Sequence, residues 1–178
     1  EVISMVGSKN FFDTSIDGEV NVTNRLRQPG SAIKPLVYAT AFMKNYSPAS
    51  VLADVVTEFP GKDDQTPYVP KNYDGKEHGL LHLRDTLASS INVPAVKLLA
   101  LLGVEDVLQQ GYRMGLVSLE PTKETMARVG LSMALGGAEV RLLDLAGAYS
   151  AFSNGGFRVE PIAILKIEDG NGRIIFEN

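Results

Sequence analysis

The sequence predicts an α+β fold, because segments with helical spacing outnumber segments with strand character. Apolar residues recur at helical intervals in five segments, which cover residues 33–44, 83–90, 95–102, 104–114 and 140–152. Residues 2–6 and 161–176, near the two ends of the chain, have β-compatible compositions. This distribution predicts a helical cluster accompanied by part of an antiparallel sheet.

Length and composition indicate one soluble domain and exclude several classes of protein. The 178 residues, 44% of them hydrophobic, can form one domain with a real core. The net charge of −4 and the scattered Lys and Arg residues argue against a nucleic-acid-binding face. Cysteine is absent, which excludes disulfides, and no apolar run approaches the roughly 18 residues of a membrane span. Because the chain opens on Glu1, we expect it to be part of a longer protein.

The segment from Ile33 to Lys44 predicts a buried helix, since it is apolar on almost every side. Pro35 stands in its first turn, where a missing N–H costs little. The following residues, 45–79, are rich in Pro, Asp, Gly and Tyr and show little periodicity. Such a long irregular stretch is typical of a functional or mobile loop.

The remaining elements are predicted from breakers and turn residues. We expect the helix of residues 83–90 to break at Asn92-Val93-Pro94 and helical spacing to resume until Gly103. Gly115 closes the next helix, and Gly155-Gly156 closes the helix of residues 140–152. Residues 161–176 predict a β-hairpin around Gly170-Asn171-Gly172. Residues 2–6 predict a strand and residues 13–27 a loop.

Ser31 and Lys34 form a Ser-x-x-Lys sequence at the start of the buried helix. Residues three apart lie on one helix face, so the Lys34 amine can reach the Ser31 hydroxyl. A serine hydroxyl is a poor nucleophile until a base takes its proton, and burial can lower a lysine pKa enough for that role. The backbone N–H groups of a helix start would help to hold a developing oxyanion. The alternative is that Ser31 caps the helix while Lys34 points to solvent.

Ser90 and Asn92 stand two residues apart at the predicted helix break. Side chains two apart in extended backbone project the same way, so Ser90 can relay a proton while Asn92 holds an amide carbonyl. The alternative is an ordinary turn, which Ser and Asn before a proline favour.

Taken together, these elements resemble the transpeptidase domain of class A penicillin-binding proteins, within the penicillin-binding protein and serine β-lactamase superfamily. Ser-x-x-Lys followed by Ser-x-Asn marks that superfamily. The likeness covers nearly the whole chain in the expected order, and it rests on residues 27–36, 70–75, 83–96, 135–140 and 148–156.

The resemblance implies a β-lactamase/transpeptidase-like fold and an enzyme that cross-links peptidoglycan. Ser31 would attack the carbonyl between two terminal D-alanines, and Lys34 would take its proton. Ser90 would pass a proton to the leaving D-alanine, and Asn92 would hold the donor peptide. The expected partners are stem peptides and β-lactams, and neither a metal nor an organic cofactor is expected. The resemblance also implies a location on the extracytoplasmic side of the bacterial membrane, anchored through a segment of the parent protein.

The third sequence of the superfamily, Lys-Thr-Gly or Lys-Ser-Gly, does not occur in this chain. The resemblance places it beyond the Gly155-Gly156 region, on a strand beside the nucleophile. We therefore expect residues 1–178 to be the N-terminal and central portion of the domain, an incomplete fold with poor activity. Two other functions share the first steps: a D,D-carboxypeptidase or β-lactamase, and a penicillin-sensing module without turnover.

Other residues suggest weaker alternatives. His78 and His82 have a spacing that can bind zinc on a helix, but Gly79 lies between them and no third ligand is evident. Asp63-Asp64 could be a carboxylate pair for sugar chemistry, but adjacent acids in a loop rich in Pro and Gly favour a solvated turn. Tyr73 either lines the substrate groove, as the resemblance implies, or packs on the core. Tyr149 and Phe152 are expected in the core.

Overall fold

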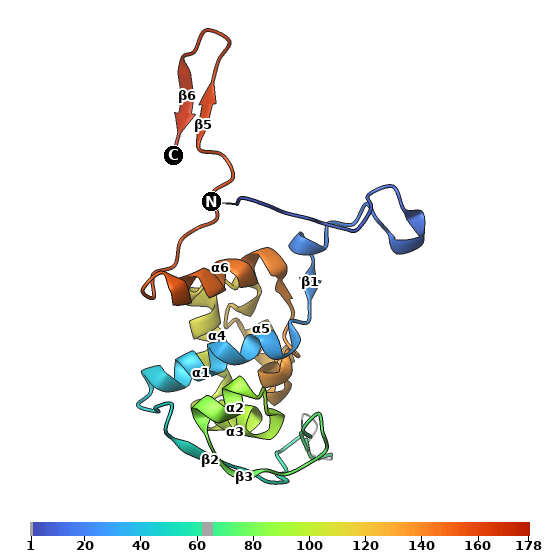
Figure 1. Ribbon diagram of the computed structural model, residues 1–178, viewed down its shortest axis with the longest axis vertical. Helices are drawn as coiled ribbons and strands as arrows, with labels where there is room; N and C mark the ends of the chain where they lie inside the picture. Colours follow the sequence, from blue (N-terminus) through green and yellow to red (C-terminus); the bar gives the residue numbers. More distant parts are fainter. Residues whose placement is uncertain (1, 62–65) are drawn as a thin grey trace.

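A computed structural model describes residues 2–61 and 66–178 of the chain (Figure 1). The α-helices are α1 (Lys34–Met43), α2 (Leu83–Ala88), α3 (Asn92–Leu102), α4 (Val104–Arg113), α5 (Lys123–Arg128) and α6 (Leu142–Ser153). The strands are β1 (Leu26–Arg27), β2 (Val51–Asp54), β3 (Gly79–His82), β4 (Val140–Arg141), β5 (Lys166–Glu168) and β6 (Ile174–Glu177). Short 3-10 helices are η1 (Thr14–Ile16), η2 (Val22–Asn24), η3 (Gly30–Ile33), η4 (Val117–Leu119) and η5 (Leu131–Leu135).

Helix α1 is the centre of the core, as its all-round apolar sequence predicts. It contacts α2, α3 and α4, and most of its residues are buried. Its side chains Val37 and Ala41, together with Ile33 just before the helix, lie in one core cluster with Leu98 and Leu99 of α3, all at 0% exposure. Each such leucine contributes roughly 1.5–3 kcal/mol through burial, so the core holds α1 rigidly.

Among the described residues, three small antiparallel sheets accompany the helices, and the α+β prediction is confirmed. Strand β1 pairs with β4, β2 pairs with β3, and β5 pairs with β6. The register of the second sheet sets Val51 opposite His82 and Asp54 opposite Gly79. The predicted hairpin near the C-terminus is present but shorter, and all its strand residues are exposed. Figure 1 shows this hairpin and the N-terminal segment standing away from the helical body, with β2 and β3 beyond its other end.

Several predictions about element positions were wrong. The loop expected at residues 13–27 contains η1 and η2 and ends in β1, which pairs with β4. Residues 2–6 form no strand; Val2 N–H reaches only Ile162 O, at 3.2 Å, without a ladder. A β-compatible composition makes a strand only where a partner strand supplies hydrogen bonds. The break between α2 and α3 lies at residues 89–91, before Asn92, since Pro94 is inside the first turn of α3. There its missing N–H costs no helical hydrogen bond.

Helix α5 and the 3-10 helix η5 were not predicted. Both are too short for a periodic pattern, with six and five residues respectively. Thr122 caps α5 by accepting a hydrogen bond from Thr125 N–H. Within residues 2–61 and 66–178, no helix has the length and apolar character to cross a membrane.

Candidate active site

Ser31 lies in the 3-10 turn η3, which leads directly into α1. Gly30 begins this turn with φ +58°, a conformation that suits glycine. The backbone N–H of Lys34 donates to Ser31 O, and residues three apart in a 3-10 turn lie nearly over one another. The Ser31 side chain is exposed while Lys34 is only 1% exposed. The turn therefore sets a surface hydroxyl above a buried amine, and the alternative of a solvent-facing Lys34 is wrong.

The Lys34 amine donates hydrogen bonds to the connection between α2 and α3. Its Nζ lies 2.6 Å from Ser90 O, 3.1 Å from Ser90 Oγ and 2.7 Å from Asn92 Oδ1. The structure thus brings Lys34 together with Ser90 and Asn92, which follow it by more than 50 residues in sequence. No hydrogen bond joins Lys34 Nζ to Ser31 Oγ among the described residues. Such catalytic contacts are often long before substrate binds.

The electrostatics of Lys34 suit a base. Burial lowers the pKa of its amine from 10.5 to about 8, because desolvation penalises the charged form. All three hydrogen-bond acceptors around it are neutral, so no carboxylate bonded to it restores the charged form. A fraction of the amine is therefore unprotonated near neutral pH.

Ser90 adopts a left-handed backbone, with φ +53°, between α2 and α3. This conformation is unfavourable for a residue with a Cβ, and strain of this kind gathers at functional sites. The connection is tied down by Ser90 N–H donating to Leu87 O at 3.1 Å and by Ile91 N–H donating to Thr86 O at 2.9 Å. The turn predicted as the alternative reading is therefore present, and it is the turn that faces the Lys34 amine.

Two elements from later in the chain support the nucleophile turn. Gly136, at the end of η5 with φ +91°, lies so close to Gly30 that a Cβ there would stand 2.2 Å from Gly30 N. The Tyr149 hydroxyl of α6 donates to Ala32 O at 2.8 Å. Tyr149 and Phe152 were expected in the core, but they are 40% and 49% exposed. Their rings instead form an edge-to-face pair at the surface of α6.

A second polar network, centred on Asn72, lies behind Asn92. Asn72 Oδ1 accepts from Asn92 N–H and Val93 N–H, at 3.0 and 3.1 Å. Its Nδ2 donates to both carboxylate oxygens of Asp54, at 2.9 and 2.8 Å. Sequence reasoning did not select Asp54 or Asn72 as functional. Asn72 belongs to the segment that carries the family resemblance, whereas an aspartate at the end of a strand carries no distinguishing signal.

The histidines do not share a metal site. His78 Nδ1 lies 2.6 Å from Asp54 Oδ2, while His82 Nδ1 lies 2.9 Å from Ala49 O. Within the described part of the chain, no three His, Cys, Asp or Glu side chains gather as metal ligands. Asp63 and Asp64 lie outside the described residues.

Tyr73 points to solvent, so the alternative that it packs on the core is wrong. Its exposure is 105% of the reference value, the highest among the large hydrophobic side chains that are exposed. Its role in lining a substrate groove stays a prediction.

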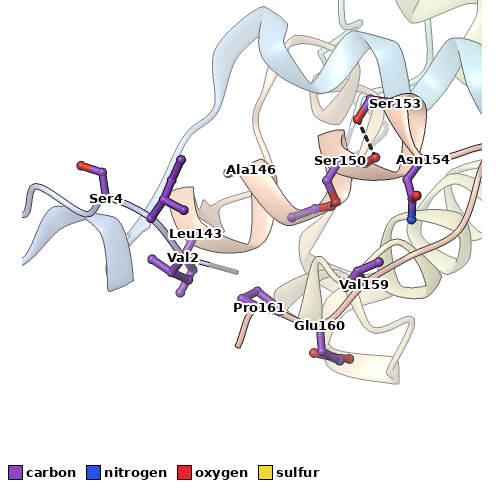
Figure 2. Close-up of a pocket in the computed structure, with 12 residues that line it drawn as sticks. Val2, Ser4, Leu143, Ala146, Ser150, Ser153, Asn154, Val159, Glu160 and Pro161 are labelled. Atoms are coloured by element: carbon purple, nitrogen blue, oxygen red, sulfur yellow. Dashed lines mark hydrogen bonds between the residues drawn. The ribbon is translucent and has the colours of Figure 1, made fainter. Parts of the chain in front are cut away.

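A pocket of about 420 Å³ lies elsewhere, between the N-terminal segment, α6 and residues 159–161 (Figure 2). Figure 2 shows Ser153 donating to the Ser150 carbonyl at its edge, at 3.0 Å. Among the described residues, Glu160 is the only ionisable side chain that lines it, and Ser31, Lys34, Ser90 and Asn92 do not. We call Ser31, Lys34, Ser90 and Asn92 the Lys34 cluster, and we place the candidate active site there and not at this pocket.

Comparison with known proteins identifies the family of this chain. The family model described as penicillin binding protein transpeptidase domain matches residues 1–177. The chain belongs to the penicillin-binding protein transpeptidase family. The fold that the resemblance implied and the family itself are thus confirmed.

The relatives of this chain include penicillin-binding proteins of the 1A type. It is 38% identical to penicillin-binding protein 1A of Aquifex aeolicus over 178 residues, which are 100% of this chain and 23% of that protein. It is 36% identical to penicillin-binding protein 1A of Neisseria lactamica, covering 97% of this chain and 21% of that one. The chain thus spans less than a quarter of the length of these relatives.

Solved structures show the same fold. The crystal structure of penicillin-binding protein 1A from Haemophilus influenzae superposes with a TM-score of 0.78 at 33% identity, covering 91% of this chain and 23% of that chain. The penicillin G acyl-enzyme complex of penicillin-binding protein A from Mycobacterium tuberculosis also gives 0.78, at 19% identity, covering 94% of this chain and 42% of that chain. Because the identity to the Mycobacterium tuberculosis protein is only 19%, this similarity shows the fold alone.

Proposed function

We propose that this chain carries the acylation centre of a serine D,D-transpeptidase that cross-links peptidoglycan stem peptides. One observation carries the proposal: a buried amine, Lys34, is hydrogen-bonded to Ser90 and Asn92 and follows Ser31 by one turn. Membership of the penicillin-binding transpeptidase family supports the same reaction class.

In the first step, the unprotonated Lys34 amine takes the proton of the Ser31 hydroxyl. Ser31 Oγ attacks the carbonyl carbon between the two terminal D-alanines of a donor stem peptide and forms a tetrahedral oxyanion. Backbone N–H groups at the η3 turn help to stabilise that oxyanion. The lowered pKa of Lys34, about 8, suits a base that works near neutral pH.

In the second step, Ser90 passes a proton from Lys34 to the departing D-alanine nitrogen, and the carbon–nitrogen bond breaks. Ser90 Oγ is within 3.1 Å of the amine that supplies the proton. Asn92 holds an amide of the donor peptide, and Tyr73 lines the groove beside it. The amine of a second stem peptide then attacks the acyl-enzyme, forms the new amide and releases Ser31.

β-Lactams are the inhibitors that this site would accept, since their strained amide imitates the D-Ala-D-Ala bond and acylates the same serine. The substrate belongs to the cell wall, so the site works on the extracytoplasmic face of the bacterial membrane, in a parent protein anchored there. The nucleophile, the base and the proton relay all come from side chains, so the steps above use no cofactor.

Acylation by residues 1–178 alone should be slow. The chain contains no Lys-Thr-Gly or Lys-Ser-Gly, which in the family supplies half of the oxyanion hole and a second cation. A protein with those residues added is expected to be acylated by penicillin faster than this chain. Equal rates would contradict this expectation.

The test is covalent labelling with a fluorescent penicillin, followed by intact mass and peptide mapping. Label is expected on Ser31, and Ser31→Ala should remove it. Ser132→Ala is the matched control, because Ser132 is an exposed serine on η5 outside the Lys34 cluster. Labelling that survives in Ser31→Ala, or none in the unaltered chain, would overturn the proposal.

A D-Ala-D-Ala thioester separates transfer from the two related activities. Formation of a new amide with an added acceptor amine supports a transpeptidase. Hydrolysis that ignores the acceptor identifies a carboxypeptidase or β-lactamase type of enzyme instead. Acylation without any turnover identifies a penicillin-sensing module.

A further inference from the structure

Asp54 is a fully buried carboxylate at the end of β2. Its exposure is 0%, and its oxygens accept from Asn72 Nδ2, from His78 N–H at 2.9 Å and from His78 Nδ1 at 2.6 Å. Because these donors compensate for the burial of the carboxylate, the Asp54 side chain is held in one position. Two residues of the 71–78 loop are therefore attached to the sheet formed by β2 and β3.

Asn72 links Asp54 to the start of α3 through hydrogen bonds at the two ends of its side-chain amide. Its Nδ2 is held by Asp54 and by Lys76 O, which lies at 2.7 Å. The opposite end of the amide, Oδ1, accepts from the N–H groups of Asn92 and Val93. These are the first two N–H groups of α3, which have no acceptor inside the helix. Asn72 therefore caps α3 from outside the helix.

The next residue back, Lys71, sets the orientation of the Asn92 side chain. Asn92 Nδ2 donates to Lys71 O at 2.9 Å, and a carbonyl only accepts hydrogen bonds. The oxygen end of the Asn92 amide is thus turned toward Lys34, which it reaches at 2.7 Å. Backbone and side chain of Asn92 are both fixed by two consecutive loop residues.

We propose that Asn72, clamped by Asp54, is a positioning residue that holds Asn92 and Ser90 in register with the Lys34 amine. The inference deepens the proposed function and rests on it. Asn72 touches no reacting atom; it acts through the start of α3 and the turn before it. Misplacement of a catalytic group by about 1 Å can cost a hundredfold in rate, so loss of this clamp should matter to acylation.

The test compares Asn72→Ala with a matched control, Asn21→Ala. Asn21 also caps a helical turn, because its Oδ1 accepts from Thr23 N–H at 3.1 Å, but it belongs to η2, outside the Lys34 cluster. Both variants lose one side-chain cap, and Asn72→Ala should lose more free energy of unfolding, because it also removes two hydrogen bonds to the buried Asp54. Only Asn72→Ala is expected to disturb the site.

Two readouts report the site without any reaction. Amide hydrogen exchange at Asn92 and Val93 should quicken about tenfold in Asn72→Ala, because both N–H groups lose their acceptor. The pKa of the Lys34 amine, followed by NMR, should rise from about 8 toward 10.5 as the site loosens and water enters. In Asn21→Ala, neither the amide exchange rates at Asn92 and Val93 nor the pKa of Lys34 should change.

Penicillin labelling adds the link to catalysis. Asn72→Ala should be acylated about tenfold to a hundredfold more slowly than the unaltered chain. Unchanged exchange and an unchanged Lys34 pKa in Asn72→Ala would overturn the positioning role. If the unaltered chain is never labelled, the proposed function fails, and the exchange and pKa readouts still decide the positioning role.

Discussion

The Nζ of Lys34 lies 2.7 Å from Oδ1 of Asn92, although the two residues are 58 positions apart in the chain. The contact joins the buried helix α1 to the first residue of α3. It gives the amine a neutral acceptor where a charged amine would gain more from a carboxylate. The interior position of Lys34 therefore lowers the pKa of the amine, and the following predictions depend on that arrangement.

The rate of Ser31 acylation should follow the deprotonation of Lys34. Burial lowers its pKa to about 8, so the rate should rise about tenfold per pH unit below that value and level off above it. A pH–rate profile with fluorescent penicillin measures this. Lys34→Arg keeps its charge at every accessible pH and should be slow throughout. A midpoint near the ordinary value of 10.5 would contradict the assignment of Lys34 as base.

Replacement of Ser90 should separate stability from rate. Glycine should give a more stable protein than alanine, whereas both replacements should slow acylation. Its φ of +53° is strained for any side chain, so Ser90→Gly should be more stable than Ser90→Ala by about 1–2 kcal/mol. Both variants lose the hydroxyl 3.1 Å from Lys34 Nζ, so both should be acylated about a hundredfold more slowly. Urea unfolding and penicillin labelling measure the two effects. Equal stability of the two variants would mean that the strain at Ser90 is absent.

Gly136→Ala should damage the nucleophile turn, because the added methyl group would meet the Gly30 backbone at 2.2 Å. The contact and the positive φ together should cost about 2–4 kcal/mol of unfolding free energy and displace Ser31. Gly156→Ala is the matched control: its φ is +89°, but nothing lies within 4 Å of the added Cβ. It should lose about 1 kcal/mol and keep its labelling rate. Equal losses in both variants would exclude the contact as the cause.

His78 should make stability depend on pH. Its hydrogen bond with Asp54 is the largest of the effects that raise its pKa above 6.5, and Asp74 adds to them. Since the folded state holds the proton more tightly, this stabilisation is complete below about 6.5 and is lost as pH rises through the raised pKa.

Urea unfolding from pH 5.5 to 9 tests the histidine. The difference in stability between the unaltered chain and His78→Gln should shrink as pH increases. His82→Gln removes the other histidine of the chain and should retain the pH dependence. A difference that grows with pH would show that His78 is bound preferentially in its neutral form.

Much of the helical framework could be predicted from sequence, because long helices that face a core carry a visible period. The segments that became α1, α4 and α6 were found within a few residues of their observed ends. The strand expected at residues 2–6 failed for a different reason. A strand is completed by hydrogen bonds to another segment, and the sequence of residues 2–6 does not say whether such a partner is present.

At the candidate site, the amino-acid sequence specifies the reactive groups: a hydroxyl and an amine three residues apart, and a serine and an asparagine that resemble those of one enzyme family. Tertiary structure alone decided that the amine is buried, that it bonds to Ser90 and Asn92, and that Asp54 and Asn72 hold Asn92 in place. The two kinds of information differ because the residues involved lie at different distances along the chain. Spacing of three residues is set by local helix geometry, whereas burial and contacts across more than 50 residues arise only when α1, α3 and the 71–78 loop pack together.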